Sequence, residues 1–500
     1  MTENNKIIII GGGVGGLSSA VRLQAKGFDV ELYEKEATLG GKMNQIKEDG
    51  YTFDVGPTIV MMPDIYKEVF EDAGRDPEDY IEMEKLDPIY SIFYPDGDRA
   101  DVSTDLPHLM DYLEGIEEEE AAGYLKYISE TYDKYLIAKN HFIEKTFRKP
   151  TDFYNPKTLL NALKLKTFDS AYHSISKYID DDKLKKLLSF QTLYIGISPY
   201  NGPSIYNIIP LIEMIYGVWF IKGGMYSLVL GMEKLFKELG GKVHLNSNVE
   251  KIVVENNRAV GIEVNNEVQK AGKVLCNGDF PYAMKNLLDD SEKEKRYRDE
   301  KIDEMDYSCS CFMMYLGVDK NLDQFEMHNI LFGKDFDGNI DDIFEGRIPM
   351  DASMYFYRPT QLDPSLAPDG KEVLYVLVPV PNLTHKNISW DDETTQSYKE
   401  HIYSRIAELP GMENFKDHVE FEKIYTPLDF ESRFNAYNGA TFGLAPTLLQ
   451  SNYFRPQGKS KKVDDLYFVG SSVHPGAGVP IVLTSAKLAV ENIMMDTEEV

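Results

Sequence analysis

Three glycines near the N-terminus have the spacing of a turn that binds a dinucleotide. Gly11, Gly13 and Gly16 form the pattern G-x-G-x-x-G. The first glycine would permit a tight turn, the second would let the backbone approach a pyrophosphate, and the third would let a helix pack closely on a strand. The unpaired N–H groups at the start of that helix would face the phosphates. The spacing therefore predicts a dinucleotide site and redox chemistry.

The residues around these glycines supply the elements that must position them. The isoleucine-rich run 6–10 is typical of a strand buried on both faces, and residues 17–25 have helical periodicity. A second strand, 28–33, ends at Glu34, where a carboxylate would accept hydrogen bonds from a ribose diol and repel a 2′-phosphate. NADP is therefore disfavoured. A glycine-rich turn without a ligand is the alternative, and the ordered strand, turn, helix and acid argue against it.

Two further stretches favour FAD over NAD. The first, Gly40-Gly41-Lys42 followed by Gly56-Pro57, would place bare backbone and a cation near the diphosphate and the flavin. The second, 466–486, indicates a strand, a glycine turn and a helix with Pro480 in its first turn. That helix would direct its dipole at a bound group such as a reduced, anionic flavin. Taken alone, an ordinary C-terminal βα unit would explain the second stretch equally well.

A predicted hairpin between residues 242 and 264, turning at Asn256-Asn257, would bring Val249 to the adenine. The predicted cofactor-binding residues are Gly11, Gly13, Val14, Gly15, Gly16, Glu34, Lys35, Gly40, Gly41, Lys42, Gly56, Pro57, Val249, Gly470, Gly478 and Val479.

No catalytic acid or base is assigned from the sequence. Glu213 is the one acid in a long apolar run, 203–221, and could stabilise a carbocation-like intermediate. A solvent-facing edge of the same helix would explain it equally well. Arg148 and His474 are weaker candidates. The run is too short and too interrupted to cross a membrane, so we expect a buried or interfacial helix.

Composition excludes some classes of function. The 500-residue chain carries a net charge of -29, which opposes nucleic-acid binding and adhesion to anionic lipid through basic patches. Any membrane contact would have to be apolar. Cys276, Cys309 and Cys311 lack metal-binding spacing and indicate buried thiols in a reducing compartment. Without a signal-peptide pattern, we expect a cytoplasmic protein.

The expected fold is α/β, because strands alternate with helices at both ends of a chain too long for one core. A Rossmann-like FAD-binding domain would be discontinuous, with a mixed α+β substrate domain and a helical, membrane-associating region inserted between its parts. We predict FAD-binding segments at 1–70, 236–285 and 436–500, a helical substrate and membrane region at 71–235, and a substrate-binding domain at 286–435.

The chain resembles the bacterial carotenoid desaturases, the phytoene desaturase type of FAD enzyme, over nearly its whole length. Related amine oxidases usually carry Gly-Asp where this chain has Gly470-Ser471, which favours the carotenoid branch. The resemblance is carried by Tyr51–Asp64, Arg148–Tyr154, Phe190–Pro199, Phe220–Tyr226, Ser451–Pro456 and Gly470–Ala486.

The resemblance implies a flavoprotein on the membrane face that transfers hydride from a polyene to flavin N5. Overall similarity points to the C30 substrate 15-cis-4,4′-diapophytoene, converted stepwise to 4,4′-diaponeurosporene. A C40 phytoene desaturase, another carotenoid flavin oxidoreductase and a non-enzymatic prenyl or lipid binder remain open. The number of steps, the final electron acceptor and the oligomeric state are not readable from the sequence. An apolar tunnel is expected, and its candidate lining residues are Tyr194, Tyr206, Tyr216, Trp219 and Phe220.

Overall fold

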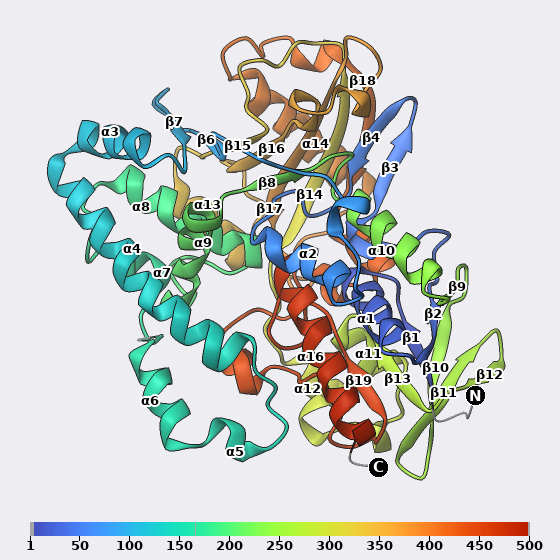
Figure 1. Cartoon of the computed structure of the whole chain (residues 1–500). Helices are drawn as coiled ribbons and strands as arrows, with labels where there is room; N and C mark the ends of the chain where they lie inside the picture. The colour runs from blue at the N-terminus through green and yellow to red at the C-terminus, as the bar shows by residue number, and fades with distance from the viewer. Residues whose placement is uncertain (1–4, 166, 499–500) are drawn as a thin grey trace.

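The computed structural model describes residues 5–165 and 167–498 (Figure 1). Its first sheet is parallel, in the order β19-β13-β1-β2-β9. The strands come from both ends and the middle of the chain: β1 (Lys6–Ile10), β2 (Asp29–Tyr33), β9 (Lys242–His244), β13 (Lys273–Cys276) and β19 (Leu466–Phe468). Parallel strands need crossover connections, which is why segments far apart in sequence can be neighbours here.

Strand β1 is buried on both faces, as its isoleucine run predicts. Ile7 and Ile9 belong to the hydrophobic core beneath the helices α1 (Val14–Ala25), α10 (Tyr226–Glu238) and α16 (Val479–Glu498). Ile8 and Ile10 belong to a second core on the opposite face. Because side chains alternate along a strand, one short run contributes to two layers.

The second core lies under a three-stranded sheet of β10 (Val249–Glu255), β11 (Arg258–Val264) and β12 (Glu267–Lys270). Strands β10 and β11 form the predicted hairpin, with Asn256 and Asn257 at φ 51° and 60°. Asparagine tolerates this left-handed region, which the tight turn requires. The prediction was wrong about where the hairpin begins, because residues 242–244 form β9, which pairs with β2 instead.

A seven-stranded mixed sheet forms the other large layer, in the order β18-β14-β17-β16-β15-β6-β7. Its middle strands are apolar and buried, as expected for a sheet covered on both faces. Two of its strands precede the helical region in sequence. The strands are β6 (Tyr90–Phe93), β7 (Arg99–Val102), β14 (Ser310–Val318), β15 (His328–Leu331), β16 (Met354–Tyr357), β17 (Glu372–Val380) and β18 (Val419–Tyr425). The two smaller pairings are β3 (Gln45–Glu48) with β4 (Tyr51–Asp54), and β5 (Met83–Lys85) with β8 (Trp219–Ile221).

Helices between residues 106 and 216 form one side of the molecule (Figure 1). The apolar run 203–221 is not one helix. Helix α9 (Ile208–Tyr216) ends at Gly217, whose φ of 75° ends the helical backbone, and β8 follows. Helices on this side are α3 (Leu106–Ile116), α4 (Glu118–Ala138), α5 (Pro150–Phe153), α6 (Pro156–Lys164), α7 (Ala171–Ile175) and α8 (Asp182–Ser189). The others are α2 (Pro63–Glu71), α11 (Phe280–Asn286), α12 (Asp299–Asp303), α13 (Phe336–Glu345), α14 (Asp392–Ala407) and α15 (Pro427–Phe434).

Among the described helices, none combines the length and the apolar character needed to cross a bilayer.

Candidate functional site

A cavity of about 1230 Å³ joins the glycine turn to an apolar chamber between the first sheet and the helical side. Its walls come from all three segments that supply strands to the parallel sheet, and from both regions between them. Every predicted cofactor-binding residue except Gly16 lines it. Such convergence of distant segments on one concave surface is typical of a ligand site.

The glycine turn is shaped by close contacts that a side chain would disrupt. A Cβ on Gly16 would lie 2.1 Å from the Gly11 carbonyl oxygen, so Gly16 allows α1 to pack on the turn without itself facing the cavity. Gly16 thus has the predicted packing role, and its predicted contact with the cofactor stays a prediction. Gly11 has a φ of 89°, which favours glycine. The Asn277 side-chain amide donates to the Gly11 carbonyl oxygen at 3.2 Å.

Glu34 is held at the end of β2 by backbone donors. Its carboxylate accepts from the Gly12 N–H at 2.7 Å and from the Glu36 N–H at 3.0 Å, and its side chain is buried. Both bonds fix the carboxylate beside the glycine turn. This is the position from which an acid can bind a ribose diol.

A second glycine turn lies directly against the first. The Gly40 N–H donates to the Gly12 carbonyl oxygen at 2.9 Å, and a Cβ on Gly41 would be 3.4 Å from the Gly13 Cα. Backbone without side chains therefore lines the polar end of the cavity from two sides. This cradle fits a dinucleotide diphosphate, which needs close backbone approach.

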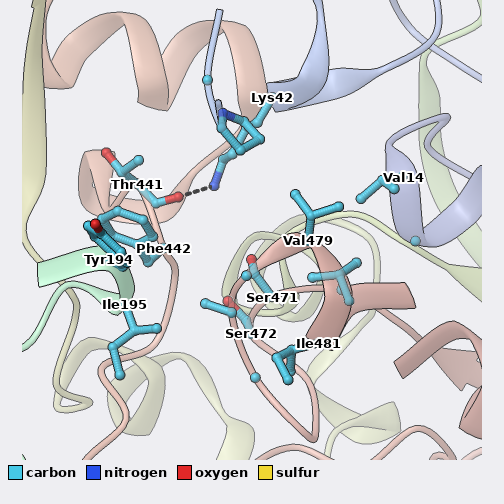
Figure 2. Close-up of a pocket in the computed structure, with 18 of the residues that line it drawn as sticks. Val14, Lys42, Tyr194, Ile195, Thr441, Phe442, Ser471, Ser472, Val479 and Ile481 are labelled. Atoms are coloured by element: carbon cyan, nitrogen blue, oxygen red, sulfur yellow. Dashed lines mark hydrogen bonds between the residues drawn. The ribbon is translucent and has the colours of Figure 1, made fainter. Parts of the chain in front are cut away.

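Lys42 lies where the polar and apolar parts of the cavity meet. Its Nζ donates to the Thr441 carbonyl oxygen at 2.8 Å (Figure 2). Burial lowers the pKa of Lys42, and the nearby Asp279 carboxylate opposes this effect. A buried ammonium with a neutral oxygen acceptor can still attract an anionic group in the cavity.

The positive ends of two helices also reach the cavity. Val14 and Gly15 belong to the first turn of α1, and Val479 begins α16, with Pro480 as its second residue. Figure 2 shows Val14 beside Val479, opposite the wall that carries Tyr194 and Phe442. Two convergent helix N-termini favour a ligand with negative charge.

Buried aromatic residues line one part of the apolar chamber, here called the closed end, and strongly exposed apolar residues line another part, here called the mouth or open end. Phe190, Phe332 and Phe336 line the closed end and pack in edge-to-face pairs, 5.9 Å and 5.1 Å between ring centroids. All three are buried. At the open end, Phe168 is 84% exposed and Leu449 is 78% exposed, and both line the cavity. A long apolar ligand could enter there.

Two of the five predicted tunnel residues line the chamber, namely Tyr194 and Tyr206. The other three do not. Tyr216 bonds to the Tyr135 hydroxyl, Trp219 donates its Nε1–H to the Tyr216 carbonyl oxygen, and Phe220 belongs to the core on strand β8. The prediction was wrong for Trp219 and Phe220 because the chain turns at Gly217 and continues into β8, and wrong for Tyr216 because this residue, the last of α9, does not line the chamber.

Glu213 is neither on a solvent-facing edge nor in the wall of the cavity. It is fully buried, and its Oε2 accepts from the Tyr90 hydroxyl at 3.1 Å and from the Gln191 amide at 3.2 Å. Burial raises its pKa to about 7, partly offset by the hydrogen bonds from Gln191 and Tyr90. Glu213 therefore lies behind the cavity wall and not in it.

The two weaker candidates, Arg148 and His474, also lie outside the cavity wall. Arg148 pairs with Asp496 near the end of α16. The His474 Nε2 donates to the Lys145 carbonyl oxygen at 3.0 Å, and burial lowers the pKa of His474 to about 4. Both residues connect the helical side to the C-terminal segment.

Sequence reasoning missed Asn277, Thr441, Phe442 and Arg455, which line the cavity. The buried Arg455 guanidinium donates to the carbonyl oxygens of Gln450, Leu444 and Ser471, so it fixes the C-terminal turn. Its burial lowers its pKa to about 10. Asn277 follows a strand directly, which was a usable signal; Thr441 and Phe442 lie in a segment without a recognisable motif.

Comparisons with known proteins agree with this geometry. A sequence model of the family described as flavin containing amine oxidoreductase matches residues 14–494. A protein of Staphylococcus aureus strain MSSA476 named 4,4′-diapophytoene desaturase (4,4′-diaponeurosporene-forming) is 50% identical over 499 residues, 99% of each chain. A putrescine oxidase bound to putrescine has a similar fold, with a TM-score of 0.63 and 14% identity over 99% of each chain. So does an oxidoreductase from Methanosarcina mazei, with a TM-score of 0.62 and 18% identity over 98% of this chain and 100% of the other.

Proposed function

The chain belongs to the family of flavin-containing amine oxidoreductases, and we propose that it is a FAD-dependent desaturase of a C30 carotenoid precursor. It converts 15-cis-4,4′-diapophytoene stepwise to 4,4′-diaponeurosporene. The observation that carries the proposal is the continuity of one cavity from a dinucleotide cradle to an apolar chamber. The full-length identity to proteins named for this reaction selects the substrate within the family.

The residues of the cradle would hold FAD. Gly11, Gly13, Gly40 and Gly41 supply bare backbone for the diphosphate, and Glu34 supplies the ribose acceptor. Bound flavin supplies a hydride acceptor, which desaturation requires. The protein adds orientation and a water-poor chamber.

The apolar chamber would bind a substrate that has no polar group. Affinity must then come from buried apolar area, at roughly 25 cal/mol per Å². The closed end at Phe190, Phe332 and Phe336 would limit how far the polyene enters, and Tyr194 and Phe442 would flank it (Figure 2). Aromatic faces near the reacting carbons would also stabilise developing positive charge.

Peripheral contact with the cytoplasmic face of the cell membrane is part of the proposal. Helix α6 buries its polar Thr158 and Asn161 and exposes Leu159, Leu160 and Leu163. Ala162, on the same helix, lines the same cavity as the exposed mouth residues Phe168 and Leu449. Exposed apolar faces of this kind favour an interfacial position, from which a polyene could pass directly into the chamber.

The test is a product spectrum from purified, FAD-loaded protein. We expect 15-cis-4,4′-diapophytoene in liposomes or mild detergent to yield the spectrum of 4,4′-diaponeurosporene, with the C40 substrate phytoene converted much more slowly. Faster conversion of phytoene would support the C40 alternative. Colourless protein that cannot be reconstituted with FAD would contradict the proposal and favour a prenyl or lipid binder.

A further inference from the structure

Three exposed lysines lie on or near helix α6, which exposes Leu159, Leu160 and Leu163. Lys149 precedes α5, and Lys157 and Lys164 lie on α6. Lys157, Leu160 and Lys164 are spaced by three and four residues, so they share one stripe of the helix. The same stripe therefore presents apolar and cationic side chains together.

The local charge is opposite to that of the whole chain. Residues 139–168 contain seven Lys or Arg against two Asp or Glu, in a protein of net charge -29. Both local acids are engaged: Glu144 lies 3.8 Å from Lys139, and the Asp152 carboxylate accepts from the Lys149 N–H. Within the described residues, no carboxylate lies within 4.0 Å of the ammonium groups of Lys149, Lys157 or Lys164.

We propose that this surface docks on bilayers that contain anionic lipid. The lysines are attracted to the negatively charged headgroups, while Leu160, Leu163 and Phe168 enter the membrane–water interface. This rests on the proposed peripheral function and names its lipid partner. We call Lys149, Lys157 and Lys164 the basic rim. Anionic membranes attract surfaces that combine such cationic side chains with an inserted apolar face. The lysines are spread along a helix and a loop and do not converge on a pocket. They are therefore better placed to bind the negatively charged surface of a bilayer than a single phosphate group.

The charge asymmetry also orients the docked protein. An anionic bilayer repels the acidic remainder of the surface and attracts only the basic rim, so the cavity mouth meets the membrane first. The net charge of the whole chain led us to expect no adhesion to anionic lipid through basic patches. Under this proposal, that expectation does not hold for this surface, because its local charge is positive.

The experiment measures sedimentation of the full-length, FAD-loaded protein with vesicles of phosphatidylcholine alone or mixed with phosphatidylglycerol. We expect tighter binding to the mixed vesicles, weakened by added salt. The variant Lys149→Gln/Lys157→Gln/Lys164→Gln should lose on the order of 100-fold in partitioning onto mixed vesicles and change little on neutral ones. A matched control, Lys26→Gln/Lys270→Gln/Lys295→Gln, removes the same charge at exposed lysines elsewhere, including β12 on the opposite side of Figure 1.

Equal binding to both vesicle types, or equal losses in the variant and its control, would overturn the proposal. Desaturation of detergent-dispersed substrate separates this outcome from failure of the proposed function. The lysine variant should retain full activity in detergent, because none of its substitutions touches the cavity wall. Loss of that activity in the wild-type protein would instead contradict the enzyme assignment.

Discussion

The two ends of the cavity recognise their ligands by different means. The polar end uses backbone: the turn at Gly11–Gly16 and the turn at Gly40-Gly41 press against each other, and side chains are excluded. The apolar end uses side chains from the helical side, the seven-stranded sheet and the C-terminal segment. A site made of backbone requires particular residues at particular spacings, whereas a site made of apolar side chains requires only that their surfaces meet. Substitutions at the two ends should therefore have different effects: those at the polar end on FAD binding, and those at the apolar end on membrane binding and substrate choice.

The largest effect is expected at the polar end. In Gly13→Val, a side chain would enter the cradle, with its Cβ 3.0 Å from the Asn277 Nδ2, so the variant should retain no FAD. The ratio of flavin to protein absorbance measures this. Asn277→Ala is the control, because it removes the contact without filling the cradle. Full FAD retention in Gly13→Val would place the cofactor elsewhere.

Next in size is the loss of the apolar mouth. Leu163→Ser/Phe168→Ser/Leu449→Ser removes three exposed apolar side chains, each worth roughly 1.5 kcal/mol or more when buried in an interface. Partitioning onto neutral vesicles should fall by about 1000-fold, with FAD content unchanged. The same substitutions at Leu106, Leu362 and Met350, which are also exposed, provide the control. Undiminished vesicle binding would show that the mouth does not face the membrane.

The buried Glu213 behind the chamber wall should make the free energy of unfolding depend on pH. Burial raises the pKa of Glu213 to about 7 from 4.5, so the folded state holds the proton more tightly than the unfolded chain. Stability from this group is present below pH 4.5 and is lost as pH rises through about 7, by about 3 kcal/mol in all. In Glu213→Gln this loss should be absent. Urea unfolding of both proteins at pH 5 and pH 8 measures the difference, and parallel pH dependence would contradict the buried, protonated carboxyl group.

The smallest effect is expected at the closed end. Phe336→Leu replaces a ring at the closed end by a smaller side chain and so lengthens the chamber. The rate with the longer substrate phytoene, relative to 4,4′-diapophytoene, should therefore rise by roughly 10-fold. Competition between the two substrates, read from product spectra, measures the ratio. Phe312→Leu, at a buried ring that does not line the cavity, is the control. An unchanged ratio for Phe336→Leu would mean that chain length is selected elsewhere.

Sequence reasoning succeeded where local geometry dictates residue type. The strand, turn and helix around Gly11–Gly16 were predicted because a buried strand needs apolar residues on both faces and a tight turn needs glycine. The Asn256-Asn257 turn and the start of α16 at Val479-Pro480 follow from equally local rules. The cofactor-binding residues themselves stay a prediction until FAD binding is measured.

It failed where a role depends on what packs against a residue. Tyr194 and Phe220 are both aromatic residues near one apolar run, yet only Tyr194 lines the chamber, because the chain turns at Gly217. Glu213 could have faced solvent, and only the packing of Tyr90 and Gln191 around it decides its burial and its raised pKa.

The sequence by itself determined the nucleotide cradle and the elements around it, since backbone conformation there restricts each position to one or two residue types. Only the tertiary structure decided the closed end, the mouth and the basic rim. Apolar burial has no direction and little residue specificity, so the same side chains could have formed an ordinary core. Their assembly into a chamber follows from long-range packing of helices and sheet that no local pattern encodes.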